Sequence, residues 1–284
     1  DFPTAWAQNA DEYIDKGLAL HDKLRGEPLL TTAFAPHAPY TVSDAPLKRL
    51  RMLADEIDIP IHMHIHETAH EVEQGISQHG VRPLARLHGL GYLDHKLMAV
   101  HMTQLTDDEI RLVGANGVHV MHCPESNLKI ASGMCPVHKL QQAGANVCIG
   151  TDGAASNNDQ DMLGELRTAA LLAKGVSGDP TAVPALTALR MATLNGAKAL
   201  GLDERIGSLT VGKAADIAAI NLSALSAQPV YDPVSQIVYA GNRDHVSDVW
   251  VAGRRLLNNG RLTTLDEAML RARAREWRAK ISRA

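Results

Sequence analysis

The sequence is poor in aromatic residues, in cysteine and in long apolar runs. Phe, Trp and Tyr make up 4% of the 284 residues, so the core must be built from Leu, Ile, Val, Ala and Met. No apolar run approaches the roughly 20 residues that span a bilayer. The formal charge of −4 gives no general attraction to nucleic acid or to anionic lipid. We therefore expect neither a membrane protein nor a nucleic-acid-binding protein.

The three cysteines, Cys123, Cys135 and Cys148, form no C-x-x-C pair. A sparse, odd set without a signal-peptide pattern is typical of a reducing compartment, so we expect a cytoplasmic protein. The sequence also lacks a Walker loop, a G-x-G-x-x-G motif and a G-x-S-x-G motif, which removes the commonest nucleotide-binding and serine-hydrolase signatures. The length fits one large domain, or one domain with a smaller appendage.

Five apolar segments read as strands, at 29–35, 60–66, 96–101, 118–122 and 146–151, with 123–127 as a loop. Helical patterns separate them and continue beyond the last, at 5–25, 44–57, 106–117, 137–143, 161–174 and 181–200; a further helical region, interrupted at Gly75 and Gly80, leads through 84–90 to the third strand. This alternation predicts a parallel sheet with right-handed crossovers. A histidine ends four of these segments and Asp152 ends the fifth, as on the catalytic face of a (β/α)8 barrel. An open doubly wound sheet also fits five strands, but we favour an incomplete barrel.

The composition changes after residue 205. Turn-rich sequence is followed by apolar segments at 217–220, 234–239 and 246–251 that read as strands, with a hairpin turn at 252–254. Thr264 and Glu267 have capping-box spacing and predict a final helix to about Ile281. The expected organisation is therefore an incomplete barrel at 1–205, part of a small β module at 206–263 and a C-terminal helix at 264–284.

The stretch IPIHMHIHET, at 59–68, is the strongest local signal. Strand alternation predicts that His62, His64 and His66 project from one face of the sheet. His64 and Glu67 form an H-x-x-E pair at the strand end. If His64 binds a metal, Glu67 lies near the open coordination position and can move a proton between water and substrate. The alternatives are histidines that hydrogen-bond one another in the core, as we expect for His62, and a His62–His64 chelating pair; His66 fits either set.

Four further strand-end residues are candidates. Asp152 follows an apolar strand, and because an unpartnered buried carboxylate is costly, a metal ion is its natural partner. His101 could orient or deprotonate an attacking water, or be a core histidine. His37 lies in the proline-flanked P-H-A-P-Y segment and could contact substrate or anchor the loop. His122 should line the same rim, with a weaker case for direct chemistry.

Taken together, these motifs resemble the amidohydrolase superfamily, and within it the 5-methylthioadenosine/S-adenosylhomocysteine deaminases. The resemblance rests on the H-x-x-E pair, on strand-terminal His101, and on three longer segments: H-C-P-E-S-N-L-K at 122–129, T-D-G-A-A-S-N-N at 151–158 and G-S-L-x-x-G-K-x-A-D at 207–216. It covers essentially the whole chain. The motifs are jointly specific for the superfamily and less so for the substrate.

The resemblance implies a distorted (β/α)8 barrel with one divalent metal ion, usually zinc, and a small β-sandwich built by both chain ends. It implies that His64 and Asp152 are metal ligands, that Glu67 shuttles protons and that His101 orients water. It also implies that His37 contacts the substrate, together with Glu67 and Asp152, the latter acting in catalysis as well. In such enzymes an H-x-H pair on the first strand supplies two more ligands.

That H-x-H pair is absent from this sequence, as are strands one to three and the first part of the sandwich. The visible strands would then be the fourth to the eighth. We expect a segment of roughly 150 residues upstream of Asp1, by the size of a complete barrel. By itself the chain should neither close a barrel nor hold metal tightly.

The expected function is hydrolytic deamination of an adenine nucleoside or thionucleoside, giving the inosine derivative and ammonia. 5-Methylthioadenosine and S-adenosylhomocysteine are the expected substrates. One alternative is another amidohydrolase reaction, such as guanine or cytosine-type deamination or s-triazine dechlorination. The other is a barrel that binds a small ligand without turnover. We expect a small-molecule nucleoside as partner and leave a homo-oligomer open.

Overall fold

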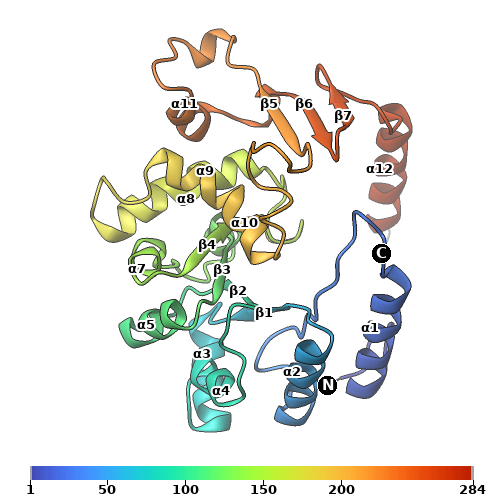
Figure 1. The fold of residues 1–284 in the computed structure, drawn as a ribbon, viewed down its shortest axis with the longest axis vertical. Helices are drawn as coiled ribbons and strands as arrows, with labels where there is room; N and C mark the ends of the chain where they lie inside the picture. Colours follow the sequence, from blue (N-terminus) through green and yellow to red (C-terminus); the bar gives the residue numbers. More distant parts are fainter. Residues whose placement is uncertain (1, 283–284) are drawn as a thin grey trace.

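A parallel β-sheet organises the first two thirds of the chain. The computed structural model describes residues 2–282, and Figure 1 shows this sheet at the centre of the molecule with helices packed along it. Its strands pair in the order β1-β2-β3-β4, and every pair is parallel: β1 is Ile61–Ile65, β2 Leu97–His101, β3 His119–His122 and β4 Asn146–Ile149. The predicted parallel α/β sheet is confirmed.

The predicted strand at 29–35 is wrong as a regular strand. Phe34 forms one isolated parallel bridge to Ile61. Its N–H donates to the Pro60 carbonyl at 3.0 Å, and the His62 and His64 N–H groups donate to the Phe34 and His37 carbonyls at 2.8 and 3.1 Å. A regular ladder cannot continue because Pro36 and Pro39 have no N–H to donate. The segment therefore lies along the free side of β1 as extended chain.

Side-chain caps begin many of the helices. Asn9, Thr68, Thr106 and Asp161 each accept a backbone N–H from the first turn that follows. The predicted capping box of Thr106 and Glu109 is confirmed, with both reciprocal bonds formed. The helices of this part are α1 Ala10–Leu24, α2 Asp44–Glu56, α3 Ala69–His79, α4 Pro83–Gly89, α5 Asp107–Ala115, α6 Pro124–Lys129, α7 Val137–Gln142, α8 Met162–Ser177, α9 Ala185–Met191 and α10 Leu194–Ala199.

Two expectations in this region need correction. Residues 123–127 are not a loop, because Pro124 occupies the first turn of α6, where its fixed φ suits a helix start and its missing N–H costs nothing. The single helix expected at 181–200 is two helices, α9 and α10. Thr193 interrupts it with φ −132° and ψ −94°, outside the helical region.

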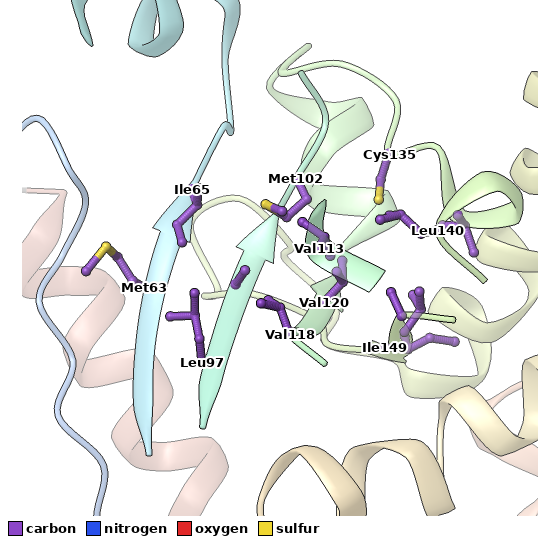
Figure 2. Packing of buried hydrophobic residues seen from close by; sticks show 14 of the residues in the cluster. Met63, Ile65, Leu97, Met102, Val113, Val118, Val120, Cys135, Leu140 and Ile149 are labelled. Atoms are coloured by element: carbon purple, nitrogen blue, oxygen red, sulfur yellow. The ribbon is translucent and has the colours of Figure 1, made fainter. Parts of the chain in front are cut away.

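The core lies between the sheet and its helices. Ile61, Met63 and Ile65 alternate along β1 and are fully buried on this side. Figure 2 shows side chains from successive strands meeting others from the covering helices; the labelled ones include Leu97, Val120, Ile149, Val113 of α5 and Leu140 of α7. The opposite face of the sheet carries His62 and His64. The strand period thus separates the core from an inner face to which β1 contributes two histidines.

The C-terminal part is a second, antiparallel sheet. It has the order β5-β6-β7-β8 and is followed by the last helix: β5 is Ile217–Ile220, β6 Val246–Val251, β7 Arg254–Asn258, β8 Arg261–Leu262 and α12 Glu267–Ile281. The predicted strands at 217–220 and 246–251 and the turn before β7 are confirmed. Positions 283 and 284 of the expected final segment lie outside the described residues. Within 2–282, every helix is too short or too polar to cross a bilayer.

Two details of this C-terminal part differ from expectation. The segment 234–239 is not a strand but lies in helix α11, Pro233–Ala240, which Asp232 caps and whose Val238 is fully buried. A short apolar run has no clear period, so a buried helix and a buried strand look alike in the sequence. The cap of α12 is Asp266, which accepts from the Ala268 and Met269 N–H groups, rather than Thr264.

Gly114 allows α5 to pack closely on the loop after α7, because an added Cβ would overlap the Ala143 backbone carbonyl. Gly114→Ala should therefore lower the free energy of unfolding by about 1–3 kcal/mol through overpacking. Gly175→Ala is the matched control: it is also helical, and a Cβ there meets nothing within 4 Å, so it should be neutral or slightly stabilising. Urea denaturation measures both, and equal midpoints for the two variants would contradict the packing described here.

Candidate active site

The candidate residues gather at one edge of the sheet. Glu67 follows β1, His101 ends β2 and Asp152 follows β4. Because these strands are parallel, their carboxyl ends lie at the same edge, which is where α/β proteins place their ligand sites. His64 lies within β1, three residues before Glu67, on the inner face of the sheet. The sequence therefore brings together residues that are up to 88 positions apart, counting from His64 to Asp152 (152 − 64).

His64 is the centre of an imidazole cluster. Its ring stacks on that of His101, with centroids 5.4 Å apart and an interplanar angle of 20°, and lies 5.0 Å from the His37 ring. The His64 Nδ1 is 2.7 Å from the His37 carbonyl oxygen, so Nδ1–H is the donor and, in the neutral tautomer, Nε2 has the lone pair. This is the tautomer that a metal-binding histidine adopts when a carbonyl orients it.

His101 and Glu67 face each other. The His101 Nε2 and a Glu67 carboxylate oxygen are 3.6 Å apart, while Nδ1 is 2.8 Å from the Asn127 side-chain oxygen. Burial lowers the pKa of His101, and the Glu67 carboxylate acts in the opposite direction. The amide fixes the ring so that Nε2 is presented to Glu67. The imidazole of His101 and the carboxylate of Glu67 can each accept or donate a proton, so together they can act as an acid–base pair at the edge of the sheet.

Asp152 is an oriented carboxylate. One oxygen accepts from the Ser126 and Ser156 hydroxyls at 2.6 and 2.7 Å, and the other accepts from the Gly153 N–H at 2.7 Å. Burial raises its pKa, but these three hydrogen bonds and the positive potential of His101 outweigh burial, so the pKa lies below its usual value. Asp152 is therefore ionised near neutral pH, as a metal ligand or a proton acceptor must be.

Left-handed backbone marks three of the strand ends. His66, His101 and Asp152 have φ of 54°, 74° and 62°, a region that costs non-glycine residues free energy and that clusters at functional sites. At His66 this turn overturns one expectation. The His66 side chain leaves the face of His62 and His64 and is fully buried. Its Nε2 accepts the Leu84 N–H at 3.1 Å, and burial lowers its pKa to about 4.

His62 and His122 contribute less directly. His62 shares the inner face with His64, with ring centroids 6.4 Å apart and nearly perpendicular; burial is the main cause of its lowered pKa. His122 does not line an open rim as expected. It is 1% exposed, burial lowers its pKa to about 3, and neither ring nitrogen has a hydrogen-bond partner among the described residues. It is a neutral buried imidazole.

The structure adds residues that sequence analysis did not single out. Glu71 accepts from the N–H groups of His66 and Glu67 at 2.9 and 2.7 Å, and the Thr103 hydroxyl donates to the Glu67 carbonyl at 2.7 Å. The backbone of Glu67 is thereby held from both sides. Asn127, Ser126 and Ser156 orient His101 and Asp152 as described above. These three lie inside the recognised H-C-P-E-S-N-L-K and T-D-G-A-A-S-N-N segments, but the sequence does not say which strand end each would reach.

The donors fit part of a metal site. His64 offers its Nε2, with Nδ1 engaged by a carbonyl, and Asp152 offers an ionised carboxylate; both are donor types suited to a divalent cation such as zinc. The part of the chain that the structure describes contains no group of three or more His, Cys, Asp or Glu side chains able to hold a metal ion together. Any complete site needs further ligands in addition to these two.

Several proteins with assigned names are similar to this chain over nearly its whole length. A protein of Teredinibacter turnerae named 5-methylthioadenosine/S-adenosylhomocysteine deaminase is 52% identical over 281 residues, which are 99% of this chain and 64% of that protein. A protein of the same name from Thermodesulfovibrio yellowstonii is 41% identical over 281 residues, again 99% of this chain and 64% of the relative. The chain thus spans somewhat less than two thirds of these relatives.

Solved structures agree with the fold. An adenosine deaminase from Xanthomonas campestris with bound zinc has a TM-score of 0.98 and 56% identity, covering 100% of this chain and 65% of that one. An atrazine chlorohydrolase from Arthrobacter aurescens in complex with zinc has a TM-score of 0.88 and 26% identity, covering 96% of this chain and 61% of that one. The amidohydrolase family model matches residues 5–256. This chain belongs to the amidohydrolase family.

Proposed function

We propose that the protein containing this chain hydrolytically deaminates an adenine nucleoside or thionucleoside, with 5-methylthioadenosine and S-adenosylhomocysteine as candidate substrates. The observation that carries the proposal is the Glu67–His101 pair at 3.6 Å, on the sheet edge that Asp152 also borders. Acid, base and oriented carboxylate are the groups that addition of water to a purine and loss of ammonia require. The names of the relatives that are 52% and 41% identical support this substrate class.

The architecture that supports this function is a completed barrel. We propose that the extended segment at 34–37 and β1 to β4 correspond to the last five strands of an eight-stranded barrel, and that β5 to β8 form part of a small sandwich. A cavity of about 650 Å³ opens at the amino ends of the strands, lined in part by Pro60, Lys96 and His119. The two relatives are longer than the residues they share with this chain, which is consistent with a barrel of more strands.

We propose that one divalent metal ion, zinc by analogy with the two solved neighbours, is held by His64 and Asp152 with ligands from outside this chain. When bound, such an ion lowers the pKa of water toward about 7. The His37 carbonyl keeps the His64 Nε2 available for the ion. Ser126, Ser156 and Gly153 keep Asp152 ionised and fixed in orientation.

The protein groups then divide the proton transfers. Asp152 and His101 take or steer the proton of the water that adds to purine C6. Glu67 donates a proton to purine N1, then takes the proton of the new C6 hydroxyl and passes it to the amino group, which leaves as ammonia. The C6 carbonyl of the inosine product forms as the C–N bond breaks, and the first water proton, held by Asp152 or His101, returns to Glu67. His37, which lies beside His64, positions the nucleoside. Water and the nucleoside are consumed, and the inosine derivative and ammonia are released.

Glu67→Gln should lower kcat by roughly 100- to 10,000-fold, because the amide cannot carry the proton between N1 and the leaving amine. The assay is ammonia release in the longer protein loaded with zinc, with adenosine, 5-methylthioadenosine and S-adenosylhomocysteine as substrates. Glu73→Gln, an exposed carboxylate on α3, is the control and should be unchanged. A Glu67→Gln protein that binds zinc and turns over at the wild-type rate would refute the role, and chloride release from an s-triazine in place of ammonia release would favour the chlorohydrolase reaction.

His64→Ala should weaken zinc binding at least ~10- to 100-fold, since even residues that only orient a ligand have effects of this size. Competition with a zinc indicator gives the Kd. His70→Ala, at an exposed position on α3, is the control for loss of an imidazole, and His62→Ala tests the chelating-pair alternative. Wild-type affinity in His64→Ala, or an equal loss in His62→Ala, would contradict the proposed ligand.

A further inference from the structure

We propose that Glu165 on α8 is a positioning residue that ties together the two segments from which Asp152 and His101 are oriented. Its effect on turnover rests on the function proposed above, whereas its effect on the two segments does not. Among the described residues, no hydrogen bond joins Glu165 directly to Asp152 or His101. It acts through α6 and through the loop at 150–161 that connects β4 to α8.

Glu165 uses both carboxylate oxygens. Its side chain is fully buried. One oxygen accepts the Glu125 N–H at 3.2 Å, in the first turn of α6. The other accepts the side-chain amide of Asn157, in the loop after β4. A single carboxylate therefore bridges the connections that follow two neighbouring strands, β3 and β4.

The two bridged segments supply the hydrogen bonds that orient the catalytic groups. From α6, the Ser126 hydroxyl donates to Asp152 at 2.6 Å, and the Asn127 side-chain oxygen accepts the hydrogen bond from His101 Nδ1 at 2.8 Å. From the loop, the Ser156 hydroxyl donates to Asp152 at 2.7 Å. The residue next to Ser156 and the residue next to Ser126 are the two partners of Glu165.

Asn157 transmits the restraint into the loop. Its N–H donates to the Gly153 carbonyl at 2.9 Å, and its side-chain oxygen accepts the Gln160 N–H at 3.1 Å. Because the side-chain oxygen is engaged by Gln160, the orientation of the Asn157 amide is fixed, and its nitrogen points to Glu165. The loop from Asp152 to Gln160 is folded around a residue that Glu165 fixes.

The burial of Glu165 is costly, which argues against a simple space-filling role. Burial raises its pKa to about 8, the Glu125 N–H and the Asn157 amide oppose this, and the charges of Glu125 and Asp159 add to it. An apolar side chain of similar volume would avoid the cost of burying a polar group. What such a side chain would lose is the bridge between the two segments.

The neighbouring Glu125 provides a contrast. Its carboxylate accepts the Thr168 hydroxyl of α8 at 2.9 Å and makes no contact with the loop after β4 in the hydrogen bonds of the described residues. Glu125→Gln makes the same carboxyl-to-amide change in the same neighbourhood and keeps an oxygen for Thr168. It is therefore the matched control for Glu165→Gln.

The first test compares these variants in the longer, zinc-loaded protein. Glu165→Ala should lower kcat about 10- to 100-fold, the size of effect seen for residues that orient metal ligands, with a much smaller change in KM. Glu165→Gln should have a smaller effect of the same kind: its oxygen can accept the Glu125 N–H, but its NH2 group then faces the Asn157 amide. Glu125→Gln should retain the wild-type kcat. Equal values for wild type, Glu165→Ala and Glu165→Gln would overturn the proposal.

Two further readouts separate positioning from general stability. Hydrogen exchange followed by mass spectrometry should show faster exchange at 124–130 and 153–160 in Glu165→Gln but not in Glu125→Gln, whether or not the protein is a deaminase. Ser156→Ala combined with Glu165→Gln should lose less kcat than the product of the single losses, because both act on Asp152. Unchanged exchange in both segments, or strictly multiplicative losses, would overturn the proposal. A wild-type protein that releases no ammonia would instead refute the proposed function and leave the exchange test decisive for Glu165.

Discussion

Parallel pairing between β1, β2, β3 and β4 is the constraint on which the site depends. It sets His64 opposite Val100, Val100 opposite Met121 and Met121 opposite Cys148, so one face of every strand is the inner face. The other face carries the buried core against the helices. Because all four strands run the same way, their ends deliver Glu67, His101 and Asp152 to one edge. A slip of one residue in any strand would turn its inner side chains into the core.

Strand geometry alone does not orient the reactive groups. His101 directly follows the inner-face residue Val100, so alternation alone would send its side chain to the core. Its left-handed backbone instead accompanies a ring that stacks on His64. Hydrogen bonds from Asn127, Ser126 and Ser156 then fix the imidazole and the carboxylate. These donors and acceptors lie in α6, which follows β3, and in the loop that follows β4. The orientation of a side chain at the end of one strand therefore depends on the segments that follow neighbouring strands. The cost of the left-handed backbone at the strand ends is offset by the hydrogen bonds of this network.

The sequence predicted most of the parallel sheet and the residues of its edge, because period-two alternation and strand-end polar residues are local signals. It failed where tertiary packing decides between similar patterns. The run at 234–239 is a helix because Asp232 and Pro233 begin one. The segment 29–35 does not continue into a ladder because Pro36 and Pro39, which follow it, have no N–H to donate. The His66 side chain could not be placed from the sequence. Its left-handed φ and its hydrogen bonds with Glu71 and Leu84 depend on how α3 and α4 pack beside β1, which strand alternation does not predict. The roles of the individual site residues stay predictions.

We propose that this chain holds half of a metal-dependent site, with His64 and Asp152 as ligands and Glu67 as the proton carrier beside them. A crystal structure of the longer protein with zinc, located by anomalous scattering, tests it most directly. The account predicts one zinc ion bonded to the His64 Nε2 and to Asp152, with further ligands from outside this chain and Glu67 facing the open position. Zinc bound elsewhere, or bound without His64 and Asp152, would contradict the account.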